Sequence, residues 1–172
     1  AHIESALGEA TVYTDLAEKL GVKYIRIMIT NHPNPEKTDF DGAVRAYQRI
    51  CDYAKDKGII PLIETNGILA ESSRMKEFME CTNRANSGVL WDIHHPYRYF
   101  NETAEETYNN IGSYVKYVHV KDSVMENGDV KYKMLGKGDV PVADALNLLV
   151  KNGYDSFITL EWVKRWCPDL ED

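Results

Sequence analysis

Short apolar segments alternate with longer amphipathic segments along this chain of 172 residues. The short segments are rich in Val, Ile, Leu and aromatic residues and are at most eight residues long, which is typical of buried strands. We predict six strands, over residues 22–29, 59–64, 88–92, 114–120, 130–135 and 157–161. An Asn127–Gly128 pair before the fifth of them predicts a tight turn.

The longer segments carry apolar residues at steps of three and four, which is the period of an amphipathic helix. Residues 2–20 and 40–57 show this pattern, and a glycine follows each of them as a stop signal. Asp39 precedes the second of these helices as a candidate N-cap. Three more helices are predicted after Ser73, around residues 102–112 and after Pro141.

This alternation of strands and helices predicts an α/β fold with parallel strands and right-handed crossovers. Near-continuous apolar strands further predict burial of the sheet on both faces. No G-x-G-x-x-G and no G-x-x-x-x-G-K-[ST] motif stands at a strand end, so the usual signatures of dinucleotide-binding and P-loop sites are absent from the sequence. Both an open doubly wound sheet and a β/α barrel fit the pattern, and the residues at the strand ends favour the barrel.

Four predicted strands end on an ionisable side chain, namely Glu64, Asp92, His119 and Glu161. Because the carboxyl ends of parallel strands open on one side of the fold, we expect these four side chains to converge. Three carboxylates in one place repel each other unless a cation joins them, and a histidine with three carboxylates suits one divalent Mn, Mg, Co or Zn ion. The alternative for any one of them is a solvated loop residue, but apolar strands gain nothing structural from four such endings.

Other polar residues near the strand ends allow two interpretations each. His95 lies three positions after Asp92 and either reaches the same cavity or is a buried packing residue, whereas His94 is expected to pack or to face solvent. Lys121 lies on the same strand face as His119 and either binds substrate oxygens or forms a rim ion pair with Asp122. The LGKGDVP segment at 135–141 is either a phosphate cradle or a tight strand-to-helix turn.

Composition and charge narrow the classes of partner. The net charge is −7, which argues against nucleic acid as a ligand because such proteins present a basic face. No apolar run approaches the ~20 residues of a membrane helix, so we expect no membrane partner. Three cysteines without C-x-x-C spacing predict reduced thiols and a cytoplasmic location.

The chain resembles the xylose-isomerase-like TIM-barrel superfamily, specifically its sugar phosphate isomerase/epimerase branch. The resemblance covers essentially the whole chain and is carried by PLIETNG, VLWDIHH, YVHVKD and the segment from LGKGDVP to FITLEW, in that order. It implies that Glu64, Asp92, His119 and Glu161 bind one divalent metal and that His95, the histidine of D-x-x-H, contacts the substrate. It also implies that residues 1–172 form a single domain of this barrel, with the six strands as its third to eighth, so that two strands and the last helix are missing and the chain is a fragment.

The function that follows is a metal-dependent sugar or sugar-phosphate isomerase or epimerase that transfers a proton through an enediolate intermediate. Glu64 and Glu161 would remove and return the proton as the catalytic pair, while His95 and Lys121 would bind the substrate. An arginine that ketose epimerases place after the metal-binding histidine is not evident in SVMENG at 123–128. A dehydratase acting on a keto-cyclitol stays open because it begins with the same proton removal, and a metal- and sugar-binding barrel without turnover stays open because two strands are missing. The resemblance also allows a homodimer, since relatives often pair, whereas the charge speaks against an apurinic endonuclease.

Overall fold

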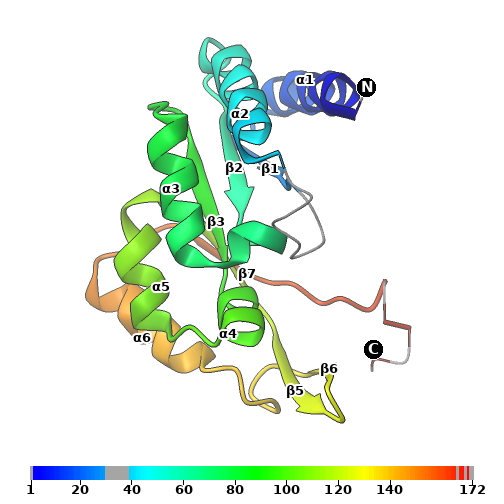
Figure 1. The fold of residues 1–172 in the computed structure, drawn as a ribbon, viewed down its shortest axis with the longest axis vertical. Coiled ribbons are helices and arrows are strands. Elements are labelled where there is room, and N and C mark those ends of the chain that lie inside the picture. Colours follow the sequence, from blue (N-terminus) through cyan, green and yellow to red (C-terminus); the bar gives the residue numbers. More distant parts are fainter. Residues whose placement is uncertain (1, 30–38, 166, 169, 171–172) are drawn as a thin grey trace.

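The computed structural model describes residues 2–29, 39–165, 167–168 and 170 of the chain and contains five parallel strands in one curled sheet (Figure 1). These strands are β1 (Tyr24–Ile27), β2 (Ile60–Glu64), β3 (Gly88–Asp92), β4 (Val115–Val120) and β7 (Phe157–Leu160), and they lie side by side in chain order. All four neighbouring pairs are parallel. The sheet is half of a barrel, which confirms the predicted α/β fold of the partial TIM-barrel type.

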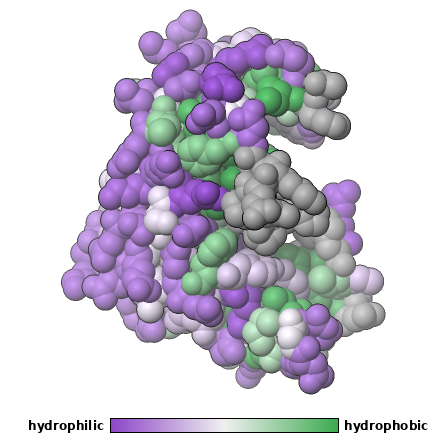
Figure 2. All heavy atoms as spheres, in the orientation of Figure 1, coloured by the Kyte–Doolittle hydropathy of each residue, from purple (hydrophilic) through white to green (hydrophobic). Residues whose placement is uncertain are grey.

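Helices connect successive strands and cover one face of the sheet. The long ones are α1 (His2–Leu20), α2 (Phe40–Lys55), α3 (Ser72–Thr82), α5 (Ala104–Ile111) and α6 (Val142–Lys151). Shorter helical segments are η2 (Gly67–Ala70), α4 (His94–Phe100) and η3 (Gly112–Tyr114), none of which the sequence pattern predicted. Figure 2 shows polar side chains over the outer surfaces of α3 and α5, on the left of the view.

Local sequence signals explain where two of the helices begin. Asp39 accepts a hydrogen bond from the backbone N–H of Gly42 and so caps α2 as predicted. Thr103 and Glu106 form a reciprocal capping box at the start of α5. The apolar faces of α2, α3, α5 and α6 then pack on the sheet in one core that contains Tyr47, Phe78 and Trp91.

The predicted strand at 130–135 exists but does not belong to the barrel sheet. It forms β6 (Asp129–Lys133), which pairs antiparallel with β5 (Asp122–Glu126) in a separate two-stranded hairpin. Asn127 and Gly128 make its turn, with φ angles of +54° and +87°, as a two-residue hairpin requires. The assignment of six strands to the barrel was therefore wrong, because the tight turn joins this strand to the segment before it instead of to a crossover helix.

The expectation of strands buried on both faces holds only in the middle of the sheet. All five residues of β3 are buried, whereas all four residues of β7 are exposed. β1 and β7 are the two edges of the sheet, so each has a neighbouring strand on one side only within the described part of the chain. Among the residues with described coordinates, no helix has the length and apolar character to cross a membrane.

Candidate metal centre

Four side chains at the carboxyl ends of neighbouring strands converge on one point. Glu64, Asp92, His119 and Glu161 each offer a ligand atom, and these atoms all lie within 4.8 Å of one another. Strand register contributes to this, because Asp92 and His119 are direct partners across β3 and β4. Glu161 follows the last residue of β7, and its backbone N–H donates to the carbonyl of Val120. The predicted convergence of the four residues is thus present in the structure, although their roles remain predictions.

The carboxylates of this cluster are held in a largely buried setting. Glu64 is 2% exposed and Asp92 is fully buried. Burial acts to raise the pKa of Asp92, but His95 and the Lys121 ammonium outweigh it and hold that pKa well below its usual range. Burial and the Asp92 charge act to raise the pKa of Glu64, but His119, Arg26 and His95 together outweigh them and lower that pKa. Both groups are therefore carboxylates at neutral pH.

Two buried atoms of the cluster lack a hydrogen-bond partner and point to a cation between them. Oε1 of Glu64 and Nδ1 of His119 are 3.4 Å apart, which is close enough for electrostatic attraction, yet neither atom has a hydrogen-bonding partner among the described residues. Buried polar atoms are seldom left unpaired in native proteins, because each costs free energy. An ion coordinated by both atoms would satisfy them, and one imidazole with three carboxylates is a donor set that divalent metals accept. The residues present therefore fit the metal that the sequence predicted.

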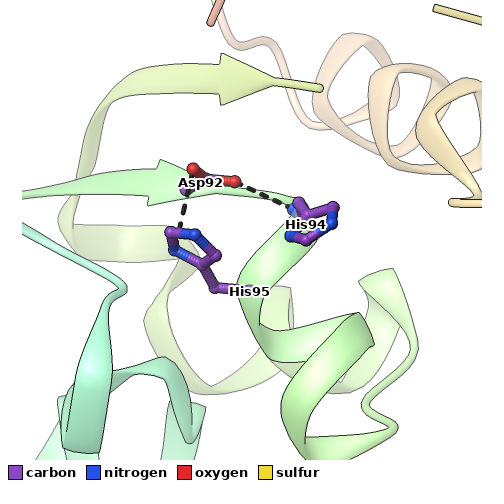
Figure 3. A group of neighbouring side chains, drawn as sticks. All are labelled: Asp92, His94 and His95. Atoms are coloured by element: carbon purple, nitrogen blue, oxygen red, sulfur yellow. Dashed lines mark hydrogen bonds and ion pairs between the residues drawn. The ribbon is translucent and has the colours of Figure 1, made fainter. Parts of the chain in front are cut away.

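His95 and His94 point in different directions (Figure 3). The ring of His95 lies beside Asp92, with Nδ1 at 3.6 Å from Oδ2, and the same Nδ1 is 2.8 Å from the carbonyl oxygen of Thr65. The ring of His94 turns away from Asp92, and only its backbone N–H donates to Oδ1 of that carboxylate. Asp92, His94 and His95 also offer ligand atoms within 4.8 Å of each other, but they share Asp92 with the larger cluster.

The surroundings of His94 assign it a packing role, as predicted. Its ring is fully buried, stacks on Tyr132 with ring centres 5.5 Å apart, and places Nε2 at 2.9 Å from the Ser123 hydroxyl. Burial lowers the pKa of His94 to about 3, against which the attraction of Asp92 is the weaker effect. His94 is therefore neutral at pH 7 and joins helix α4 to the β5–β6 hairpin.

Lys121 is buried and forms ion pairs within the cluster. Its ammonium nitrogen donates to Oδ2 of Asp92 and, at 2.6 Å, to Oε2 of Glu161. The alternative of a rim ion pair with Asp122 was wrong, because the side chain of Lys121 is only 4% exposed and its ion pairs are with Asp92 and Glu161. Burial acts to lower the pKa of Lys121, but the two carboxylates outweigh it and raise that pKa above the ordinary value.

The glycine-containing segment after β6 is a turn organised by Asp122 and not a phosphate cradle. The backbone N–H groups of Gly136 and Gly138 both donate to Oδ2 of Asp122 at 2.9 Å. The N–H groups of Ser123 and Val140 donate to Oδ1 of the same carboxylate. Because the carboxylate already takes these four donors, the segment has no free cluster of amides for a phosphate group.

A cavity of about 270 Å³ opens beside the cluster, and part of its lining was not foreseen from the sequence. Glu64, His95, Lys121 and Glu161 line it, as do the following residues that were not predicted: Arg26, Met28, Asn66, Tyr132, Val163 and Cys167. Arg26 donates to Oε1 of Glu161 at 3.0 Å and lies 3.6 Å from Oε2 of Glu64. A charged residue inside the apolar strand VKYIRIMI was the signal that could have identified it.

Comparison with known proteins identifies the family of the chain. The model of the xylose isomerase-like TIM barrel matches residues 2–172. The chain belongs to the xylose isomerase-like TIM barrel family. A search of curated proteins returned no match.

Solved structures of this family superpose on the chain over most of its length. A xylose isomerase domain protein from Planctomyces limnophilus is 25% identical, with a TM-score of 0.79 over 94% of this chain and 60% of its own. A D-allulose 3-epimerase from Methylomonas sp. is 24% identical, with a TM-score of 0.76 over 92% and 56%. A xylose isomerase-like TIM barrel protein from Mycobacterium smegmatis, in complex with magnesium, is 18% identical, with a TM-score of 0.74 over 92% and 60%. The chain thus spans less than two thirds of the length of these proteins.

Proposed function

We propose that this chain carries the catalytic site of a metal-dependent sugar or sugar-phosphate isomerase or epimerase that moves a proton through an enediolate intermediate. The observation that carries the proposal is the arrangement of Glu64 and Glu161, which both line the cavity and both belong to the four-residue cluster. Membership of the family and the similarity to a D-allulose 3-epimerase support it. We further propose a cytoplasmic location and a homodimer, as the sequence and the resemblance predict.

One divalent Mn, Mg, Co or Zn ion would be held by Glu64, Asp92, His119 and Glu161. When bound, such an ion polarises carbonyl and hydroxyl oxygens of the substrate and stabilises the negative charge that develops on them. The magnesium in the Mycobacterium smegmatis structure supports a metal of this kind here. The unpaired Oε1 of Glu64 and Nδ1 of His119 support its position in this chain.

The remaining chemistry belongs to side chains of this chain. A carboxylate oxygen of Glu64 removes the proton next to the substrate carbonyl, and Glu161, which takes up a proton from solvent before this step, returns it from the other side; Glu64 then loses its proton to solvent. Return to the same carbon on its other face gives an epimer, and return to the neighbouring carbon gives an isomer. Arg26 contacts both glutamates and so orients them toward the cavity.

His95 is placed to bind the substrate through one defined ring nitrogen. The carbonyl of Thr65 can only accept a hydrogen bond, so Nδ1 of His95 must carry the hydrogen in that 2.8 Å contact. This leaves Nε2 of His95 for a substrate hydroxyl or oxygen in the cavity that the residue lines. The contact with Thr65 therefore fixes the orientation of the ring before any substrate enters.

A dehydratase is the second candidate, and Lys121 is the observation that favours it. Dehydration begins with the same proton removal but also needs a group that protonates the departing hydroxyl. The buried ammonium of Lys121 lines the cavity next to Glu161 and could supply that proton. Isomerase and dehydratase then differ in their product, not in their first step.

The test is turnover of a panel of ketoses, ketose phosphates and keto-cyclitols by Mn²⁺-loaded protein in D₂O. An isomerase or epimerase forms an isomer of the substrate, with deuterium at the carbon to which the proton was returned. A dehydratase forms a product that has lost water. Glu64→Gln should abolish both products, while Glu77→Gln, an exposed glutamate on α3, should leave them unchanged. Full activity of Glu64→Gln on a demonstrated substrate would show that the role given to this residue is wrong.

A further inference from the structure

We propose that Lys121 is an internal cation of the carboxylate cluster, which competes with the divalent metal for Asp92 and Glu161 and is displaced from them when the metal binds. This inference rests on the proposed metal site and adds a residue that controls its affinity. It gives Lys121 a position in the metal-free protein, between two ligand carboxylates, and a second position in the metal-bound protein, facing the cavity.

Lys121 forms ion pairs with two of the carboxylates that would bind the metal. Its ammonium bridges two of the three cluster carboxylates, those of Asp92 and Glu161. Arg26 is a second cation at the cluster, and it forms ion pairs with Glu161 and Glu64. Each carboxylate that would bind the metal therefore already has a cationic partner from the chain itself.

A charge count shows what these two cations do. Glu64, Asp92 and Glu161 contribute three negative charges, and Arg26 with Lys121 contributes two positive charges, so the cluster carries −1 when the imidazoles are counted as neutral. Without Lys121 the same cluster would carry −2 in a buried site, where uncompensated charge is costly. The ammonium therefore stabilises the metal-free protein and at the same time lowers the gain from binding a divalent ion.

The ammonium of Lys121 and a divalent metal ion cannot both bind the same carboxylate oxygens strongly. Oδ2 of Asp92 and Oε2 of Glu161 point at the ammonium, and an ion that shares these oxygens repels it at short range. Lys121 has four rotatable methylene groups and lines the cavity, so its ammonium can turn toward the open space without movement of strand β4. Released in this way, it becomes a donor for a substrate oxygen, which is the role that the sequence suggested for it.

The experiment measures Mn²⁺ binding by calorimetry and thermal unfolding of metal-free protein, for wild type and for Lys121→Met. The variant should bind Mn²⁺ at least about tenfold more tightly, since each tenfold step corresponds to only about 1.4 kcal/mol. Its metal-free form should unfold at a lower temperature, and added Mn²⁺ should raise that temperature more than in wild type. Lys133→Met, which removes a half-buried lysine paired with Glu126 on the hairpin, should change neither quantity.

Lys121→Arg and Lys121→Gln keep the test decisive if the methionine variant does not fold. Arginine retains the positive charge and should leave the affinity for Mn²⁺ within a few-fold of wild type, whereas glutamine removes the charge and should increase it. Equal or weaker Mn²⁺ binding by the uncharged variants would overturn the inference and leave the metal site intact. Absence of Mn²⁺ binding from wild type and variants alike would instead overturn the proposed metal site itself.

Discussion

Burial of Asp92 is the residue-scale feature on which the site depends. A fully buried carboxylate is tolerated only when cations or hydrogen bonds compensate its charge, and here Lys121 and the backbone N–H of His94 do so. The sequence predicted the acidic residues because each one stands at the end of an otherwise apolar strand. It did not predict Arg26, because its contact with Glu161 joins positions 135 residues apart and follows from the curl of the sheet.

Replacing Asp92 by asparagine should destabilise the metal-free protein. The substitution leaves the ammonium of Lys121 with one carboxylate partner in a buried site, and breaking a buried ion pair costs about 3–5 kcal/mol. Asp52→Asn provides the matched control, because it breaks an ion pair with Arg84 at the surface and should cost far less. Urea unfolding of both variants without metal measures the difference, and equal stabilities would contradict the compensation described for Asp92.

At the scale of the element, the β5–β6 hairpin contributes Tyr132 to the cavity and leads into a loop that Asp122 organises. The sequence predicted the turn at Asn127–Gly128 and the strand after it, because Asn-Gly is a strong local signal. It did not predict β5, whose residues DSVME have no regular apolar period. Nor did it predict that Asp122 organises the following loop, because that contact depends on the tertiary positions of four backbone amides.

Gly138→Ala should disrupt the loop that Asp122 organises. A Cβ atom at position 138 would overlap the carboxylate of Asp122 and the carbonyl oxygen of Ser123, so the loop must shift and lose hydrogen bonds. Overpacking of this kind typically costs about 1–3 kcal/mol. Gly8→Ala is the control, since this glycine lies inside α1 with open space around its Cβ position, and alanine should stabilise the helix by about 0.5–1 kcal/mol. Thermal unfolding of the two variants should therefore shift in opposite directions.

At the scale of the whole molecule, the half-barrel leaves two sheet edges. The alternation of elements predicted the parallel sheet, since each strand–helix unit repeats a local pattern. The number of strands in that sheet could not be predicted in the same way, because a strand in the hairpin and a strand in the barrel have the same local sequence character. The resemblance supplied the barrel geometry that brings Glu64 of β2 close to Glu161 beyond β7.

The exposed edge strand β7 predicts self-association of the 172-residue chain. Ile158 and Leu160 are 45% and 49% exposed on a strand whose outer edge has no partner among the described residues, and apolar edge strands promote pairing with other chains. Ile158→Lys should shift the chain toward monomer in sedimentation experiments over a range of concentrations. Val150→Lys, at an apolar position of α6 that is 75% exposed, should not. A monomer at every concentration for the unmodified chain would contradict this prediction.

The four-residue metal centre can be observed directly in an anomalous difference map from crystals soaked in Mn²⁺. We expect one strong peak bound by Glu64, Asp92, Nδ1 of His119 and Glu161, at metal–ligand distances of about 2.0–2.3 Å. In the same map the ammonium of Lys121 should have left Asp92 and Glu161. A manganese ion bound elsewhere, or no ion at saturating Mn²⁺ while the ammonium of Lys121 stays in place, would contradict the claim that these four residues form a metal centre.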